Sequence, residues 1–224
     1  MITLSQLVQE LQEGVYDPNI FKAIFLAGGP GSGKSYVAKR TLGGQGLKVV
    51  NSDDAFEKLL KKAGLSLRMP EREKLPRDIV RTRAKELTKT RQTNYIEGRL
   101  GLIIDGTGRD YDRITKQASE LQTLGYDTYM IFVHTTLETA LARNKARKSR
   151  SLLDKVVERT WDKVQKNLEI YRNAFKGNFT FVSTEDTKPG ELPKDTKRAV
   201  MRFISSPIKN KTAQSWIAKA EKVL

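Results

Sequence analysis

The chain has 224 residues, 41 Lys and Arg against 26 Asp and Glu, one His and no Cys, and its formal net charge is +15 at pH 7. The absence of Cys excludes thiolate zinc sites, cysteine nucleophiles and iron–sulfur clusters. No apolar run approaches the roughly 20 residues that cross a bilayer, and the acidic opening segment is unlike a signal peptide. We therefore expect a cytoplasmic protein with no membrane partner.

Five short apolar runs predict β-strands, and the segments between them show the apolar spacing of helices. The predicted strands are residues 21–28, 47–50, 100–105, 128–133 and 179–182. The predicted helices after the first four strands are residues 34–42, 54–63, 114–124 and 137–147. Nearly continuous apolar character indicates strands that are buried on both faces. The pattern predicts an α/β fold, a three-layer sandwich around a five-stranded parallel sheet.

The remaining segments complete the plan of the chain. Apolar residues recur over 152–175 as on one long amphipathic helix. A turn-rich loop at 184–195 precedes two further predicted helices. We expect a helical lead-in over residues 1–20, a nucleotide-binding domain over 21–183, and a linker with a helical appendage over 184–224.

The first predicted strand runs into a glycine-rich sequence that fits the phosphate-binding pattern G-x-x-x-x-G-K-[ST] between a strand and a helix. It consists of Gly28, Gly29, Pro30, Gly31, Ser32, Gly33, Lys34 and Ser35. Such a P-loop surrounds phosphate oxygens with backbone N–H groups, and the following helix directs its positive end at the same charge. We expect Lys34 to reach the β- and γ-phosphates of ATP and Ser35 to bind Mg²⁺.

Two common classes of nucleotide-using protein fit less well. Motor ATPases place Asp-Glu after the third strand, whereas here Asp105 is followed by Gly106. A GTPase needs N-K-x-D to recognise guanine, and the nearest string ends in Arg147 where the Asp belongs. A phosphotransferase is the better interpretation, since it needs a carboxylate base and cations around the transferred phosphoryl group.

Two carboxylates follow the second predicted strand, which ends in Asn51-Ser52-Asp53-Asp54. This is the edge of the sheet where open α/β folds bind ligands. Asp53 or Asp54 is therefore a candidate general base for an acceptor hydroxyl. The alternative is that one of the two only caps the helix that follows.

Cations gather in the second half of the chain, where residues 139–176 hold eleven Lys or Arg and four acidic residues. Arg143 and Arg147 lie four apart on one predicted helix face, and Arg150 continues the cluster into a loop. We expect this segment to close over the nucleotide as a lid, with solvated surface charge as the alternative. With the net charge it predicts an anionic partner, nucleic acid first, unless the cations only keep the protein soluble.

These motifs resemble the group of P-loop kinases that includes the 5′-kinase domain of phage polynucleotide kinase and the zeta-toxin kinases, over about residues 22–183. The likeness to polynucleotide kinase rests on residues 28–35, on residues 51–54 and on Arg143-Asn144-Lys145-Ala146-Arg147. It implies that Asp53 is the general base and that Arg147 contacts the transferring phosphate. The sequence departs from that enzyme at Phe56, where an Arg is expected, which weakens the case for a terminal 5′-hydroxyl acceptor.

The likeness to zeta toxins rests on Asp105-Gly106-Thr107-Gly108-Arg109 and on Asp54-Ala55-Phe56. This likeness implies that Asp54 is the general base. We favour Asp53 as the base and keep Asp54 as the alternative. Zeta toxins phosphorylate a nucleotide sugar, a substrate that does not call for a charge of +15. Phage kinases of this group that phosphorylate hydroxymethylpyrimidines in DNA would account for the charge.

We therefore expect a Mg²⁺- and ATP-dependent kinase that moves the γ-phosphoryl group to a hydroxyl of a nucleic acid or nucleotide. Asp105 is expected near Mg²⁺ or the acceptor, beside Thr107 and Arg109, and Arg143 and Arg147 are expected to clamp the phosphates. Residues 71–98 either line an acceptor channel or form a solvated helix. The alternatives are a zeta-toxin-like nucleotide-sugar kinase and, from another class, a nucleic-acid-binding ATPase without phosphotransfer; the oligomeric state is left open.

Overall fold

The computed structural model describes residues 15–147, 151–185 and 194–222. Within these ranges five parallel strands form one sheet in the order β2-β3-β1-β4-β5. They are β1 (Lys22–Ala27), β2 (Lys48–Val50), β3 (Leu102–Asp105), β4 (Asp127–His134) and β5 (Phe179–Ser183). The five predicted strands and the α/β fold class are confirmed. Most of the predicted lead-in over residues 1–20, and Arg150 of the predicted lid, lie outside the described residues.

β1 lies at the centre of the sheet, and all of its residues are buried. Its side chains alternate between two apolar clusters: Phe25 belongs to one with Met130 of β4, and Ile24 to the other with Tyr129. Strands buried on both faces read as continuous apolar runs, which is why the sequence pattern located them. β2 lies at an edge, where Val49 is exposed.

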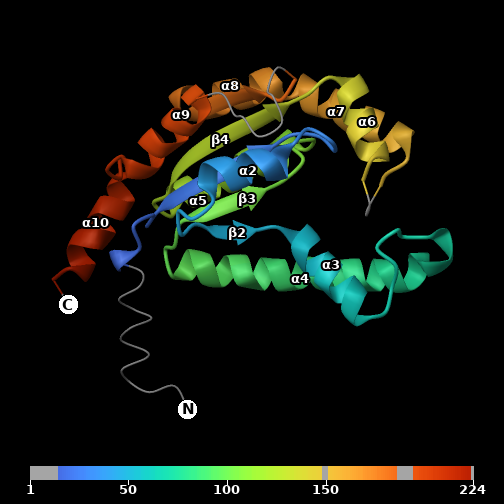
Figure 1. The fold of residues 1–224 in the computed structure, drawn as a ribbon. Helices are drawn as coiled ribbons and strands as arrows, with labels where there is room; N and C mark the ends of the chain where they lie inside the picture. The colour runs from blue at the N-terminus through green and yellow to red at the C-terminus, as the bar shows by residue number, and fades with distance from the viewer. Residues whose placement is uncertain (1–14, 148–150, 186–193, 223–224) are drawn as a thin grey trace, which may run out of the picture.

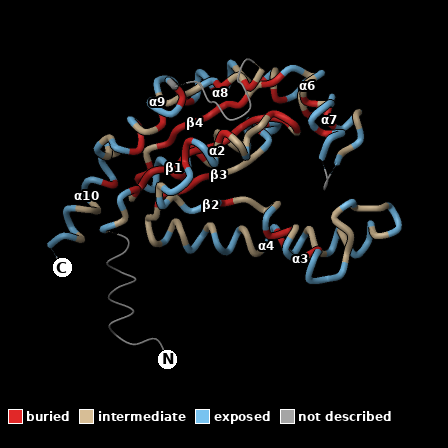
Figure 2. Tube along the Cα trace, in the orientation of Figure 1, coloured by how far each residue is buried: buried red, intermediate tan, exposed pale blue. Residues whose placement is uncertain are grey.

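Helices cover both faces of the sheet and give the three predicted layers (Figure 1). On one face, α2 (Lys34–Leu42) and α9 (Lys194–Ser205) add Val37 and Phe203 to the cluster of Ile24. On the other, α5 (Tyr111–Thr123) and α8 (Leu168–Phe175) add Leu121 and Phe175 to the cluster of Phe25. Burial is therefore concentrated in the strands and the inner sides of these helices (Figure 2).

The single long helix predicted over residues 152–175 is wrong. The structure has α7 (Asp154–Lys166) and then α8, with Asn167 between them. The Asn167 N–H bonds the Val164 carbonyl three residues back at 3.2 Å, so the chain tightens there. The Asn167 side chain donates to the Gly108 carbonyl at 3.0 Å. Apolar spacing continues through this turn, so the periodicity gave no sign of the break.

The two C-terminal helices, α9 and α10 (Lys211–Ala220), pack directly on the sheet. Asp127, the first residue of β4, accepts the backbone N–H groups of residues 209–210 at 2.9 and 3.1 Å. The same carboxylate pairs with the buried Lys22 of β1 at 3.1 Å. Trp216 of α10 packs edge-on against Phe21, with ring centroids 5.5 Å apart. The predicted appendage thus closes the edge of the sheet at which the strands begin.

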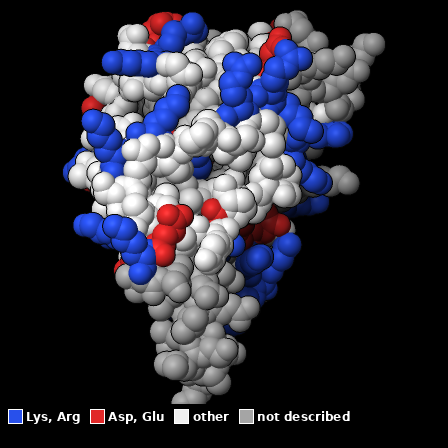
Figure 3. Space-filling view, turned by 90° about the vertical axis from the view of Figure 1, so that its left-hand side faces the viewer, with Lys and Arg blue, Asp and Glu red and all other residues white. Residues whose placement is uncertain are grey.

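The face at that end of the molecule is also basic. Figure 3 shows Lys and Arg side chains along both flanks of this face, an uncharged area between them and a smaller group of Asp and Glu side chains below it. Because this face lies away from the P-loop, the net charge of +15 is spread over the surface rather than confined to the predicted site.

α3 (Ser52–Lys62) and α4 (Lys74–Glu97) form what we call the α3–α4 arm, which lies beside β2 and extends past the sheet (Figure 1). A short 3₁₀ turn, Glu71–Glu73, leads into α4, and a second one, Lys176–Asn178, leads into β5. The arm has a small apolar cluster of its own, made by Ala55, Phe56, Leu60 and Ala84. In the described part of the chain no helix is long and apolar enough to span a membrane.

Candidate active site

The P-loop joins β1 to α2, as the motif predicts. Gly31 and Gly33 adopt left-handed backbone conformations, with φ of 79° and 86°, which favour glycine. A Cβ atom at Gly31 would also collide with the backbone of Ala140, the fourth residue of α6 (Leu137–Lys145). Gly33 is the N-cap of α2 and offers no side chain to its first N–H groups. Those N–H groups are the ones that bind a phosphate at a helix start.

Arg143 of α6 is bound to the P-loop rather than placed freely above it. Its guanidinium donates to the Gly31 carbonyl at 3.3 Å and to Thr184 Oγ1 at 2.8 Å and the Thr184 carbonyl at 3.1 Å. Thr184 Oγ1 in turn donates to the Ser32 carbonyl at 3.0 Å. Arg143 therefore ties the P-loop to the end of β5, a contact that the sequence did not indicate.

Lys34, Arg147 and the carboxylates at the ends of β2 and β3 form one electrostatic cluster. Burial lowers the pKa of Lys34, Asp105 and Asp53 raise it, and Arg147 lowers it further. Burial raises the pKa of Asp105, against the opposing effect of Lys34, and Asp53 and Asp54 raise it as well. The structure thus brings together five of the predicted site residues from the starts of α2 and α3, the end of β3 and the segment after α6.

The two carboxylate oxygens of Asp105 differ in their hydrogen bonding. Its Oδ2 accepts a hydrogen bond from Asn51 Nδ2 at 2.8 Å. Its Oδ1 is buried and has no hydrogen-bond partner among the described residues. A buried carboxylate oxygen without a partner is costly unless a ligand satisfies it, so this atom fits a bound cation or a donor on a substrate.

Asp53 and Asp54 both lie in the first turn of α3, and neither is its cap. The cap is Asn51, whose Oδ1 accepts the Asp53 N–H at 2.7 Å. The alternative that one of the two Asp residues only caps the helix is therefore wrong. Asn is among the preferred N-cap residues, so the sequence did contain this signal.

Arg81 of α4 is a site residue that sequence reasoning did not single out. Its guanidinium pairs with Asp53 Oδ1 at 2.7 Å and lies over the Phe56 ring, 4.7 Å from its centroid. Phe56 is the position where the resemblance to polynucleotide kinase leads one to expect an Arg. In the structure an arginine of α4, Arg81, lies over Phe56 and pairs with Asp53.

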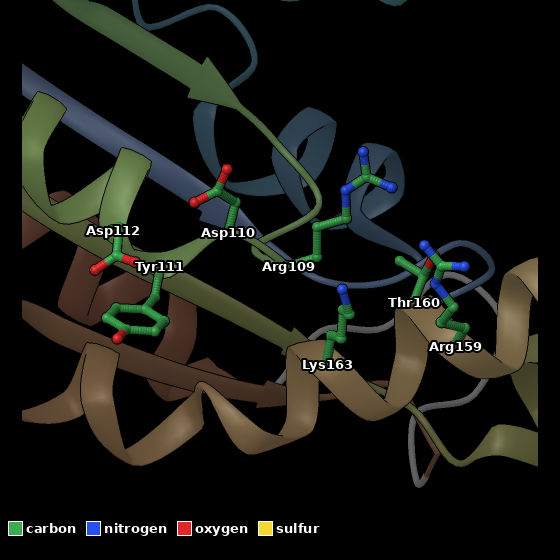
Figure 4. Close-up of a pocket in the computed structure, with 7 residues that line it drawn as sticks. All are labelled: Arg109, Asp110, Tyr111, Asp112, Arg159, Thr160 and Lys163. Atoms are coloured by element: carbon green, nitrogen blue, oxygen red, sulfur yellow. The ribbon is translucent and has the colours of Figure 1, made fainter.

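The segment between β3 and α5 lies beside the P-loop. The Gly28 N–H donates to the Thr107 carbonyl at 2.9 Å, and the Gly106 N–H donates to the Leu26 carbonyl at 3.1 Å. A cavity of about 380 Å³ opens between this segment and α7 (Figure 4). It is lined by Arg109, Asp110, Tyr111, Asp112, Arg159, Thr160 and Lys163. Of these, only Arg109 was a predicted site residue.

The chain is similar to a known family in sequence and to solved structures in fold. The family model described as "AAA domain" matches residues 24–170, more than half of the chain. No curated protein matches the sequence. The fold is similar to a chain in the crystal structure of AvrRxo1-ORF1:-ORF2 with ATP, at 15% identity and a TM-score of 0.60 over 91% of this chain and 71% of that one.

Two further solved structures have the same fold. A putative kinase from Chloroflexus aurantiacus gives a TM-score of 0.52 at 17% identity, over 81% of this chain and 96% of that one. A chain of the PezAT chromosomal toxin–antitoxin system of Streptococcus pneumoniae gives 0.51 at 17% identity, over 98% of this chain and 93% of that one. At such identities the likeness shows a P-loop, kinase-like fold.

Proposed function

This chain belongs to the AAA domain family, and on that premise we propose that it is a Mg²⁺- and ATP-dependent kinase that phosphorylates a hydroxyl group. The observation that carries the proposal is the cluster of Lys34 at the start of α2, Asp53 in the first turn of α3 and Asp105 at the end of β3. A P-loop lysine beside two carboxylates is the minimal set for phosphoryl transfer to a hydroxyl. The shared fold with a putative kinase supports it.

In this proposal the P-loop amides and the start of α2 hold the triphosphate, and Lys34 contacts its β- and γ-phosphates. Arg143 keeps the loop in shape through Gly31 and Thr184. Arg147 lies close enough to Lys34 to lower the pKa of that lysine. In the proposal it stabilises the negative charge of the transferring phosphoryl group.

Ser35 in the first turn of α2 and Asp105 at the end of β3 would hold Mg²⁺, which supplies charge neutralisation at the β- and γ-phosphates when bound. The buried, unpartnered Oδ1 of Asp105 fits such a ligand. Asn51 fixes the other oxygen of that carboxylate at 2.8 Å and so sets its orientation.

Asp53 is the proposed general base. It takes the proton of the acceptor hydroxyl as the oxygen attacks the γ-phosphorus and the bond to the ADP oxygen breaks. Arg81 holds the Asp53 carboxylate at 2.7 Å and thereby orients it. Asp54, one residue further along α3, is the alternative base.

The proposed acceptor is a nucleic acid or a nucleotide, in line with the resemblance to the phage polynucleotide kinase group and the net charge of +15. A nucleotide-sugar kinase of the zeta-toxin type is the second candidate. The specific observation in its favour is that Thr107 and Arg109 of the Asp105–Arg109 motif lie on the segment that borders the P-loop.

The test is γ-phosphate transfer from labelled ATP to a panel of acceptors. The panel contains 5′-hydroxyl DNA and RNA, DNA with hydroxymethylpyrimidines, nucleosides, nucleotides and UDP-N-acetylglucosamine. We expect label on one class, lost in Lys34→Ala and in Asp53→Asn, with Asp54→Asn as the matched control. Full activity in Asp53→Asn would move the base to Asp54. Release of inorganic phosphate alone, faster with nucleic acid, would replace the kinase by a nucleic-acid-dependent ATPase.

A further inference from the structure

Three cations gather around the cavity between the β3–α5 segment and α7. They are Arg109 on the first side and Arg159 and Lys163, one helical turn apart, on the second. In Figure 4 their head groups lie toward one end of the cavity, and the carboxylates of Asp110 and Asp112 lie toward the other. Asp110 is already engaged as the N-cap of α5, where it accepts the Arg113 N–H at 3.2 Å.

Among the described residues, these three cations have no carboxylate partner, unlike two lysines on the neighbouring parts of α6 and α7. Lys166 pairs with Asp162 at 2.8 Å, and Lys145 with Asp154 at 3.1 Å. Within the described ranges, no ion pair or hydrogen bond joins Arg109, Arg159 or Lys163 to another side chain. The three positive charges repel one another at their end of the cavity, and an anion bound among them removes that repulsion.

The cavity is preformed and adjacent to the P-loop. Trp161, between the two α7 cations, donates its ring N–H to the Thr135 carbonyl at 2.8 Å, which fixes this side of α7. A Cβ atom on Gly29 would lie 3.7 Å from the Trp161 Cα, so the helix backbone rests against the P-loop. On the opposite wall, Thr107 is bound to Gly28, two residues before Arg109. Because the backbone that carries the three cations is already held in place, only their side chains are ordered when an anion binds.

We propose that this cavity is a second phosphate subsite, which binds a phosphate group carried by the acceptor. The inference rests on the proposed kinase function and sharpens it: the acceptor bears a phosphate as well as the hydroxyl that is phosphorylated. The triphosphate of ATP already has the P-loop amides, Lys34 and Arg147, so the three cations are left for the other substrate. Both a polynucleotide and a nucleotide or nucleotide sugar provide such a group.

The first experiment uses pyrophosphate as the probe and needs no catalysis. The P-loop is filled with a non-hydrolysable ATP analogue, and pyrophosphate is titrated in by calorimetry. We expect saturable binding to the parent protein and at least about tenfold weaker binding to the double variant Arg159→Gln, Lys163→Gln, the effect of losing one or more charge-assisted contacts. Lys166→Gln is the matched control on the same helix, outside the cavity, and binds as the parent does.

Three results would overturn the subsite: no saturable pyrophosphate binding while the analogue is bound, equal binding by the parent and the double variant, or an equal loss of affinity for the ATP analogue. The last result would assign the cations to ATP. Since the substituted side chains are exposed, the fold is expected to persist, and an unchanged melting temperature checks this. Charge-retaining Arg159→Lys, Lys163→Arg should restore binding.

The second experiment separates the sources of the phosphate and the two proposals. A 5′-hydroxyl oligonucleotide and UDP-N-acetylglucosamine are each tested as competitors of pyrophosphate. The compound that displaces pyrophosphate identifies the class of acceptor whose phosphate binds in the cavity. In the transfer assay the double variant should raise the acceptor KM at least about tenfold with the ATP KM unchanged. If no acceptor is phosphorylated while pyrophosphate still binds as described, the kinase proposal fails and the anion site stands. If transfer occurs with an unchanged acceptor KM, the subsite fails and the kinase stands.

Discussion

The sheet and the α3–α4 arm are built differently, although each carries part of the candidate site. β1 is buried along its whole length between two apolar clusters, whereas α4, 24 residues long, buries only Ala84. Lys34 and Asp105 rest on the densely packed sheet, and Asp53 and Arg81 rest on the arm. We infer that replacing a buried side chain costs more stability in the sheet than in the arm.

Phe25→Ala is expected to have the largest effect on stability. The side chain is 1% exposed and packs on Phe175 with ring centroids 5.6 Å apart. Removing a buried phenyl ring costs about 3–5 kcal/mol of unfolding free energy, because a cavity remains. Urea unfolding measures the loss. A cost below about 1 kcal/mol would show that the sheet is not the more densely packed region.

Phe56→Ala makes the matched change in the arm. Phe56 is buried, but its cluster is small and the side chain borders Arg81. We expect a loss of about 2 kcal/mol, since the surroundings can relax into the space, together with reduced transfer because Arg81 loses the ring beneath it. The same urea titration and the transfer assay report the two effects. A loss equal to that of Phe25→Ala would abolish the distinction between the regions.

Arg81→Gln separates catalysis from stability within the arm. Its ion pair with Asp53 is partly exposed and contributes about 1 kcal/mol or less to folding. We expect transfer to fall about tenfold, because the base is no longer held in position. The control is Arg83→Gln, which breaks the exposed pair with Glu86 on the same helix. Equal activity of the two variants would remove Arg81 from the site.

Glu185, two residues after the end of β5, predicts that the stability of the sheet region depends on pH. Its carboxylate accepts hydrogen bonds from residues at the start of α6. Burial opposes the shift, but hydrogen bonds from Thr135, Thr136 and Thr139 lower the pKa of Glu185 from 4.5 to about 2. A carboxyl with a depressed pKa in the folded state stabilises the fold above its unfolded value, and this contribution is lost as the pH falls from about 4.5 to about 2.

Because Glu185 is partly open to solvent, we expect about 1 kcal/mol from it. Urea unfolding of the parent and Glu185→Gln at pH 7 and pH 3 measures the difference. The variant should lose less stability on acidification, and an equal loss in both proteins would exclude Glu185 as a source.

Ile79→Gln is expected to have the smallest effect. Ile79 lies on α4 and is 72% exposed, so its replacement changes unfolding free energy by less than about 0.5 kcal/mol. A thermal melt checks this, and a shift above about 3 °C would mean that the surface of α4 is packed against something.

Much of the architecture could be predicted because buried parallel strands and a P-loop both leave local signals. A strand buried on both faces is a continuous apolar run, and the P-loop is a contiguous string between a strand and a helix. The turn at Asn167 left no such signal, because a single Asn is only a weak sign of a helix end and its contact with Gly108 joins residues far apart in the chain.

The site residues that were missed share one property: only the fold selects them. Arg81 is one of several cations on α4, and its role depends on the approach of α4 to α3. Arg159 and Lys163 were counted in a basic segment, but the cavity that distinguishes them from Lys166 exists only once α7 lies beside the P-loop.

The ion pair of Lys22 and Asp127 has a consequence for synthesis on the ribosome. β1 is the first strand to be made, yet its neighbours β3 and β4 come at least 75 residues later, since β1 ends at Ala27 and β3 begins at Leu102. The Lys22 ammonium also donates to Ser206 Oγ, and Asp127 accepts the backbone N–H groups of residues 209–210. The centre of the sheet therefore forms only after segments that are synthesised late have emerged. In a nascent chain without residues 203–210, the ion pair of Lys22 and Asp127 is exposed to water.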